Sequence, residues 1–410
     1  MISFNSFIAE AADSKQNLHL THSEEDIYER GNVGAQAAVS FIEDFVETLG
    51  KGQTKITVKW DGSPAIFCGT DPEDGKFFVG TKSVFAKTPK VYKTAKDIRD
   101  NESGGKADKL LVALEELSKI GIPKDTVLQG DLLWTPGDFR YESIDGERYL
   151  TVHPNTIVYA WPSESDIAKR IRQTRLGIVF HTTYRGRGVL ANYRATFGAN
   201  VNRLKQTKTC WFDDAFFKGV DIAFTEAEHK EVMDNLNKAK KLIGNFDKIV
   251  SVMDSIPSTA AGANIKTFIN SYIRTGKYPS SATAYKEYIQ YLKTYYEDKV
   301  ISKVKSDTAK DSKRGQLQQL LQDINNHKKT FQQSFEYVEY ITKAKMIVIN
   351  KLNSLMKDKT FVKTKDGFKV TPVEGFVAID TKSGAAVKFV DRLTFSWSNF
   401  NPEILKGWMR

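Results

Sequence analysis

A lysine that could act as a nucleophile stands at position 59, at the end of a strand-like segment. From Lys55 onward polar and apolar residues alternate up to Asp61, and the following Gly62-Ser63-Pro64 is typical of a turn. A free lysine amine has a pKa of about 10.4, so it is protonated at neutral pH. It attacks an electrophile only where its surroundings lower that pKa. A solvent-facing strand lysine is the alternative interpretation of Lys59.

Four further charged residues lie on or beside other predicted strands: Lys82, Asp131, Glu374 and Lys388. If the fold gathers them around Lys59, two carboxylates and three lysines would share one site. Such a set suits a triphosphate, because Mg²⁺ and ammonium groups neutralise the charge of departing pyrophosphate. Each residue also has a structural alternative: Asp131 could cap a turn, Glu374 could be a strand-edge carboxylate, and Lys388 could be a surface residue.

The run Lys59-Trp60-Asp61-Gly62 resembles the K-x-D-G motif of the covalent nucleotidyltransferases, which comprise DNA ligases, RNA ligases and capping enzymes. The resemblance implies that Lys59 attacks the α-phosphorus of ATP or GTP, forms a lysine–nucleotide phosphoramidate and releases pyrophosphate. It places Val58, Asp61 and Gly62 at the nucleotide. Asp61 would lie near the ribose or order the turn, and Gly62 would let the backbone approach the ligand.

Other segments resemble the remaining motifs of that family, in the same order. They are Val79–Ser83, Leu128–Leu132, Gly177–His181, Val373–Val377 and Ala386–Phe389. The resemblance implies one role for each: Lys82 near a substrate phosphate, Asp131 on the sugar or a metal, Phe180 stacked on the purine, Glu374 on the catalytic metal, and Lys388 on the α-phosphate. Asp131 and Glu374 are therefore the candidate Mg²⁺ ligands. Phe180 could equally be a core residue, since aromatic side chains are usually buried.

The chain departs from the family pattern in several places. Position 64 is proline where an arginine commonly follows the lysine motif, and Val390 stands where a second lysine is usual. The segment around Phe180 lacks its usual acidic residue. Residues 389–410 are too few for a five-stranded OB domain. This shortness counts against mRNA capping and against a conventional two-domain DNA ligase.

Hydrophobic periodicity predicts an α+β fold with a mostly helical insertion. The resemblance implies that this fold is the ligase type of nucleotidyltransferase, with antiparallel sheets around an ATP cleft. We expect residues 1–222 to form the first part of the nucleotidyltransferase domain and 360–410 its closing strands. A helix is expected before Gly50, which would end it. The insertion, 223–359, begins with a capping box from Thr225 to Glu228 and ends with one or two long helices.

Two features of the insertion could contact nucleic acid. One is a group of tyrosines, for which packing is the first interpretation and base stacking the second: Tyr285, Tyr288, Tyr291, Tyr295 and Tyr296. The other is a run of basic residues, either a solvated helix end or a phosphate-binding surface: Lys299, Lys303, Lys305, Lys310, Lys313 and Arg314.

Composition adds weaker expectations. The 410 residues carry a net charge of +10 and only two cysteines, Cys68 and Cys210. The charge favours polyanionic partners, and the cysteine usage suits a reducing cytoplasm. No run of about 18 apolar residues is present, so no membrane partner is expected. We expect a monomer in the cytoplasm, or in the host cytoplasm if phage-encoded. The runs 59–69 and 80–92 also resemble uncharacterised proteins of large tailed phages.

The sequence therefore predicts an ATP-dependent polynucleotide ligase that joins 5′-phosphate to 3′-hydroxyl ends through a lysyl-AMP on Lys59, a reaction used in DNA repair. DNA, RNA and hybrid substrates all remain open, as does GTP in place of ATP. One alternative is an adenylyltransferase that acts on a protein or small molecule. Another is a catalytically degenerate module that still binds nucleic acid.

Overall fold

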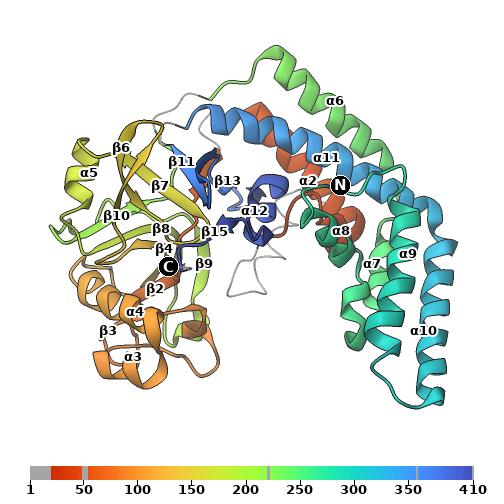
Figure 1. Ribbon diagram of the computed structural model, residues 1–410, viewed down its shortest axis with the longest axis horizontal. Helices are drawn as coiled ribbons and strands as arrows, with labels where there is room; N and C mark the ends of the chain where they lie inside the picture. The colour runs from red at the N-terminus through yellow and green to blue at the C-terminus, as the bar shows by residue number, and fades with distance from the viewer. Residues whose placement is uncertain (1–19, 49–53, 219–221, 357–358, 409–410) are drawn as a thin grey trace.

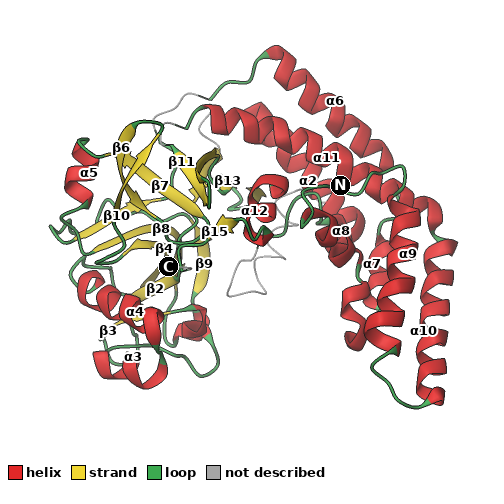
Figure 2. Cartoon of the chain, viewed as in Figure 1, coloured by secondary structure: helices red, strands yellow, loops and turns green. Residues whose placement is uncertain are grey.

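The computed structural model describes residues 20–48, 54–218, 222–356 and 359–408. It is a mixed α+β structure whose sheets are mainly antiparallel, which confirms the predicted fold class at that level. The strands gather in one half of the molecule and most long helices in the other, with α6 and α11 running between them (Figures 1 and 2). Gly50, the expected helix end, lies outside the described residues.

The first sheet has three antiparallel strands from distant parts of the sequence. β1 (Thr54–Lys59) pairs with β13 (Gly375–Asp380), which pairs with β14 (Ala386–Phe389). Val58, Phe376 and Phe389 lie opposite one another across the three strands and are buried in the helical core. Because side chains alternate along strands, the other face carries Lys59 and its neighbours. One wall of this sheet therefore faces the helices and the other faces the remaining strands.

The second sheet has six strands in the order β10 (Cys210–Asp214), β8 (Leu176–Arg185), β4 (Thr126–Trp134), β2 (Ala65–Thr70) and β3 (Phe77–Gly80), with β9 (Arg194–Phe197) also paired to β8. Only the β10–β8 pair is parallel among them. One face packs on α4 (Gly104–Leu117) through an apolar cluster that includes Leu110, Leu128 and Phe180. The short elements α3 (Ala95–Asn101), η1 (Lys82–Phe85) and η2 (Leu190–Asn192) lie outside the sheet.

The third sheet runs in the order β12 (Gly367–Thr371), β11 (Thr360–Thr364), β7 (Ile157–Pro162), β6 (Glu147–Val152) and β5 (Arg140–Ile144), and β15 (Ile404–Leu405) pairs with β11. It packs on the second sheet through an aromatic core in which Trp134 meets Trp211 and Trp161, with ring centroids 5.1 and 6.0 Å away. The helix α5 (Asp166–Ile171) contributes Ala168 and Ile171 to this core.

The other half is helical and has one continuous apolar core. Its helices are α6 (Glu226–Leu242), α7 (Asp247–Asp254), α8 (Ile265–Ile273), α9 (Ala284–Tyr296), α10 (Asp307–Asn326) and α11 (Lys328–Ser354), together with α2 (Ile27–Thr48). The capping box of Thr225 and Glu228 is confirmed at the start of α6. α2 packs against α6, α7 and α11, so the N-terminal helix shares the core of the segment that follows residue 222.

The tyrosines of α9 mostly serve packing. Tyr288 and Tyr296 are fully buried, and the hydroxyl of Tyr288 donates to the carbonyl of Ala263 at 2.8 Å. Tyr291 donates to the carbonyl of Gly262 at 2.7 Å, and Tyr295 accepts from the amide of the same residue at 3.2 Å. These contacts fasten α9 to η3 (Ser258–Ala263). The aromatic group therefore holds the helices together, as the packing interpretation predicts.

Buried ion pairs tie the chain before α2 to the rest of the molecule. Lys345 of α11 donates to Glu24 at 2.6 Å, with both side chains completely buried. Arg392, at the start of η5 (Arg392–Ser396), pairs with Glu25. His22 forms an isolated β-bridge with Lys388 of β14. The segment before α2 therefore lies beside the strand that carries Lys388.

None of the helices among the described residues is both long and apolar enough to cross a membrane.

Candidate active site

Lys59 and Glu374 form an ion pair at one end of the three-stranded sheet. The register of β1 and β13 sets Lys59 opposite Gly375, so the residue that precedes β13 reaches the lysine amine. The Lys59 side chain is 34% exposed and that of Glu374 only 9%. The lysine side chain is thus partly accessible to solvent, whereas that of Glu374 is nearly buried.

The same face of the sheet carries a second lysine. Val377 lies opposite Thr57 on one side and opposite Lys388 on the other, so these side chains share a face with Lys59. Burial and the neighbouring charge of Lys59 lower the pKa of Lys388 to about 8. The negative charge around Lys388 is therefore too small to offset the cost of burying its ammonium group.

The second sheet supplies the opposite wall. Gln129 and Asp131 of β4 point toward Lys59, and a bulge in β8 brings in His181. At this bulge Gln129 pairs with Thr182 and Gly130 with Phe180, so His181 has no partner residue across the ladder. Bulges re-aim a side chain in this way. As a result His181 and Thr182, although adjacent in sequence, both line the same hollow.

These walls enclose a hollow of about 310 Å³. Near Lys59 the lining side chains are mostly polar or charged, and aromatic rings also line the hollow. The lining residues are Leu20, Thr57, Val58, Lys59, Trp60, Gln129, Asp131, His181, Thr182, Tyr184, Phe197, Val377 and Lys388. A volume of this order is enough for a small ligand that remains partly open to solvent.

The charges in the hollow are strongly coupled. Burial alone would lower the pKa of Lys59, but Glu374, Asp131 and Asp61 outweigh it and raise that pKa above its usual value. Burial raises the pKa of Asp131 to about 7, and Lys59 only partly opposes this rise. Burial likewise raises the pKa of Glu374, against the attraction of Lys59. The resting amine is therefore protonated and surrounded by carboxyl groups that take up protons near neutral pH.

His181 is neutral in this site. Burial and the charge of Lys59 lower its pKa to about 4. Its Nε2 lies 3.7 Å from Oδ2 of Asp131, beyond hydrogen-bond distance, and its Nδ1 lies 2.8 Å from the hydroxyl of Thr182. The carboxylate of Asp131 is thus left without a close cationic partner among the described residues.

Asp61 is turned away from the hollow and orders the chain. Its Oδ2 accepts hydrogen bonds from the amides of Thr156 and Ile157 at 2.7 and 2.8 Å, and its Oδ1 accepts one from the side chain of Asn155 at 2.6 Å. The amide of Asp61 donates to the hydroxyl of Tyr159 at 2.6 Å. Of the two predicted roles, the geometry favours the ordering of the turn.

Gly62 and Val58 contribute through the backbone. A Cβ added to Gly62 would lie 2.7 Å from both Cβ of Asp131 and the carbonyl oxygen of Leu132, so only glycine lets the turn pack on β4. Val58 lines the hollow, although its side chain is buried in the helical core. Both residues position Lys59 and Asp131 relative to one another.

Two predicted residues lie elsewhere. Phe180 is fully buried in the core between β8 and α4, on the face of the sheet opposite to the hollow, so its ring is not available to a base there. Lys82 is exposed at the start of η1 and does not line the hollow. The rings that do line it are Trp60, Tyr184 and Phe197, of which Trp60 and Phe197 are half-buried.

Sequence reasoning missed Gln129, His181 and Phe197 as lining residues. Gln129 and His181 were within reach, since each is next to a residue of a predicted motif and on a predicted strand. Strand alternation would have placed Gln129 on the face of Asp131, because the two are separated by one residue. No pattern in the sequence announces the bulge at His181 or the return of Phe197 from a separate strand.

The two remaining questions about the site are its class and its family. The fold and the hollow define an α+β protein with a lysine–glutamate pair on an antiparallel sheet that faces a second, mainly antiparallel sheet. The chain belongs to DUF6267, a family of unknown function, whose model matches residues 17–404. Comparison with curated proteins gave no match, and neither did comparison with solved structures. The chemistry must therefore be argued from the hollow itself.

Proposed function

We propose that this protein is an ATP-dependent nucleotidyltransferase of the polynucleotide-ligase type, with Lys59 as the residue that accepts AMP. The observation that carries the proposal is the ion pair of Lys59 with Glu374, together with the hollow that Lys59, Asp131 and Lys388 line. Two amines and a carboxylate in one small cavity, with a second carboxylate paired to one of the amines, match the needs of transfer from a triphosphate.

The amine has to lose a proton before it can attack. In the resting pair the carboxylate of Glu374 raises the pKa of Lys59. A cation held by Glu374 would cancel that counter-charge, and burial would then favour the neutral amine. The proton passes to water, which reaches the partly exposed side chain. Lys59 Nζ then bonds to the α-phosphorus as the bond to pyrophosphate breaks.

Two carboxylates are a suitable protein contribution for Mg²⁺, which is usually held by one or two carboxylates plus substrate phosphates and water. Glu374 and Asp131 are the residues that would hold it, and the raised pKa of Asp131 marks a buried carboxyl group that lacks positive charge. Among the described residues, no three His, Cys, Asp or Glu side chains are grouped so that they could hold a metal ion together. When bound, the ion supplies charge neutralisation for the leaving pyrophosphate.

Lys388 suits the α-phosphate. The pKa of its amine is lowered by burial and by Lys59, so a bound phosphate would relieve an unfavourable charge rather than replace an existing partner. In the ligase reaction the AMP on Lys59 then passes to a 5′-phosphate, and a 3′-hydroxyl displaces it.

The proposal is tested by intact-protein mass spectrometry after incubation with ATP and Mg²⁺. The wild-type chain should gain the mass of one AMP, and Lys59→Ala should gain none. Lys369→Ala is the matched control, because Lys369 is an exposed strand lysine on β12 that does not line this hollow. If the wild-type chain gains no mass with ATP or GTP, the protein is not a covalent nucleotidyltransferase.

The acceptor is tested in a second step. Protein labelled from α-³²P-ATP should lose its label to an oligonucleotide with a 5′-phosphate and keep it with the same oligonucleotide bearing a 5′-hydroxyl. Label that stays on the protein with both oligonucleotides would exclude the ligase reaction and favour transfer to a protein or a small molecule.

A further inference from the structure

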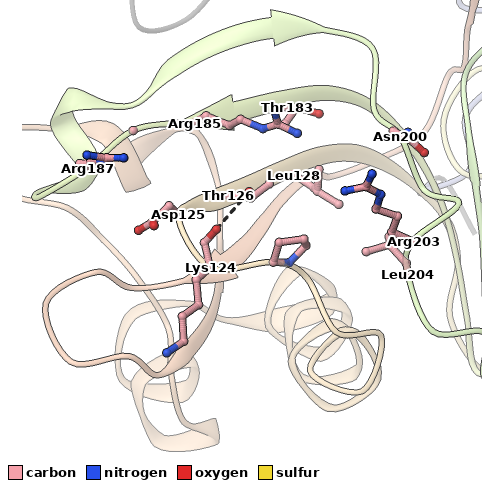
Figure 3. Close-up of a pocket in the computed structure, with 12 residues that line it drawn as sticks. Lys124, Asp125, Thr126, Leu128, Thr183, Arg185, Arg187, Asn200, Arg203 and Leu204 are labelled. Atoms are coloured by element: carbon pink, nitrogen blue, oxygen red, sulfur yellow. Dashed lines mark hydrogen bonds between the residues drawn. The ribbon is translucent and has the colours of Figure 1, made fainter.

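Two more hollows lie along β8 and are lined by basic residues, and the smaller one borders the site hollow. The larger one, about 810 Å³, contains Lys124, Arg185, Arg187 and Arg203. Figure 3 shows these side chains coming from separate segments around one concave surface. The smaller one, about 460 Å³, adds Lys55 and Lys218. Two acidic residues, Asp125 and Asp214, line the two hollows.

Most of this positive charge is not neutralised. Lys218 pairs with Asp213 and Asp214 at 2.9 and 3.0 Å. Within the described part of the chain, no carboxylate forms a salt bridge with the remaining five basic residues of the two hollows: Lys55, Lys124, Arg185, Arg187 and Arg203. All five are exposed. Such a concentration of free cations in a concave surface attracts a polyanion.

The larger basic hollow borders the smaller one, and the smaller one borders the site hollow. The two basic hollows share Thr183, Arg185 and Asn200. The smaller one and the site hollow share Phe197. Along β1 every second side chain points to the same face, so Lys55, Thr57 and Lys59 lead from the smaller hollow into the site over roughly 13 Å.

Two aromatic rings line the smaller of the basic hollows. Phe197 and Phe216 are half-buried and line the smaller hollow. The amine of Lys55 lies over the ring of Phe216, 5.4 Å from its centroid. Grooves that bind single strands combine cations for the backbone with rings for unpaired bases. The smaller hollow offers both.

The basic run before and at the start of α10 is a less suitable binding surface for a polyanion. Lys310 pairs with Asp307 at 3.5 Å and Arg314 with Asp311 at 3.0 Å. Of its remaining cations, only Lys313 lies on α10, and the others precede that helix: Lys299, Lys303 and Lys305. None of them lines the hollows described above. The structure thus favours the solvated-helix interpretation of that run.

We propose that the two basic hollows bind a single-stranded polynucleotide and lead its end to Lys59. The direction of the strand rests on the proposed ligase function, whereas the binding itself does not. Arg185, Arg187 and Arg203 contact phosphates in the larger hollow, and Phe197 and Phe216 contact bases in the smaller one.

The test is fluorescence anisotropy without ATP, with labelled oligodeoxythymidylate and oligouridylate of about 16 nucleotides, a length within the range that such grooves cover. The test variant is Arg185→Gln/Arg187→Gln/Arg203→Gln. The control Lys303→Gln/Lys305→Gln/Arg314→Gln removes the same charge from exposed positions of the basic run. Three lost phosphate contacts should weaken binding about 100-fold at 0.1 M salt and reduce the slope of log K against log salt by about 2. The control should change binding much less.

The outcomes test binding of the strand to the basic hollows separately from adenylylation of Lys59. Equal losses in both triple variants would overturn the assignment, because net charge alone would then explain binding. So would displacement of the oligonucleotide by polyglutamate of equal charge, which would indicate a site for acidic protein. Self-adenylylation of the test variant, measured by mass, should remain at the wild-type level. A wild-type chain that binds the strand but forms no adduct would leave the groove standing and remove the ligase proposal.

Discussion

Lys59 and Glu374 meet although the whole helical segment lies between them in the sequence, and the register of β1 against β13 alone decides that they do. A slip of one residue would turn Lys59 toward the helical core and bring Val58 into the hollow. The paired glycine, Gly375, has a φ of 153°, and an added Cβ would lie 2.4 Å from the carbonyl oxygen of Phe389. Glycine at this position therefore lets β13 pass close to β14 directly beside the lysine.

Glu374→Gln should slow formation of the lysyl-AMP by about 100-fold, the order expected when one charged group that stabilises the transition state is removed. It should also shift the pH dependence. Glu374 raises the pKa of Lys59, so its removal lowers that pKa and moves the pH of half-maximal rate downward. The rate of adduct formation at ATP concentrations well below saturation reports the free enzyme and checks both effects. It is followed by mass from about pH 6 to about pH 10, the usual range of lysine titration. An unchanged midpoint would mean that the pair does not set the ionisation of Lys59.

Asp131→Asn should stabilise the protein at alkaline pH and leave its stability unchanged at acidic pH. The folded-state pKa of Asp131, about 7, lies above its ordinary value of 3.8, so between these values the folded state holds a proton that the unfolded state releases. Wild-type stability therefore falls as pH rises through this window, by at most about 4 kcal/mol. Urea unfolding at pH 4 and pH 8 in EDTA measures the difference. Asp366→Asn, at an exposed position, should show none.

Asp61→Asn should lower the free energy of unfolding by about 1–3 kcal/mol, and Asp61→Ala by more. An amide has one acceptor oxygen, so it cannot serve both Asn155 and the backbone amides of Thr156 and Ile157. Urea titration gives the stability, and calorimetric titration of the folded variants gives their affinity for ATP. Loss of ATP affinity at wild-type stability would instead indicate a contact with the nucleotide.

Two matched Phe→Leu variants separate core from ligand contact. Phe197→Leu should weaken ATP or oligonucleotide binding by about tenfold, because its half-buried ring lines the hollow and is free to stack. Phe180→Leu should cost about 1 kcal/mol of stability and leave binding unchanged, because that ring is fully buried against α4. Calorimetric titration of both variants measures their binding affinity, and thermal unfolding measures their stability. The reverse pattern would restore Phe180 as the base platform.

Local patterns predicted the elements that hold the lysine and its partners. The alternation after Lys55 gave β1, the apolar run from Thr126 gave β4, and the stretches at Gly375 and Ala386 gave β13 and β14. The strands β2, β5, β6 and β10 were not predicted. Of these, the outer strand β5 is mostly exposed and carries little apolar alternation. No proline marks the break between α10 and α11 at His327, so one helix and two were indistinguishable.

The non-local features were beyond reach of these patterns. Which strand pairs with β1, and in which register, depends on contacts between residues that no local period connects. The same holds for Phe180, since a core ring and a base platform on one strand differ only in what covers that face of the sheet. Asp61 was predicted with two roles, and only the position of Asn155 and its neighbours separates them.

The strand that carries Lys59 has two different faces. One face lines the hollow, whereas on the other face Val58 and the residues paired with it pack against the helices. The helical half therefore supports the strand that carries Lys59 and is not a separate appendage. Any displacement of those helices, whether by an occupant of their own surface or by heat, would be transmitted across a single thickness of sheet to the amine.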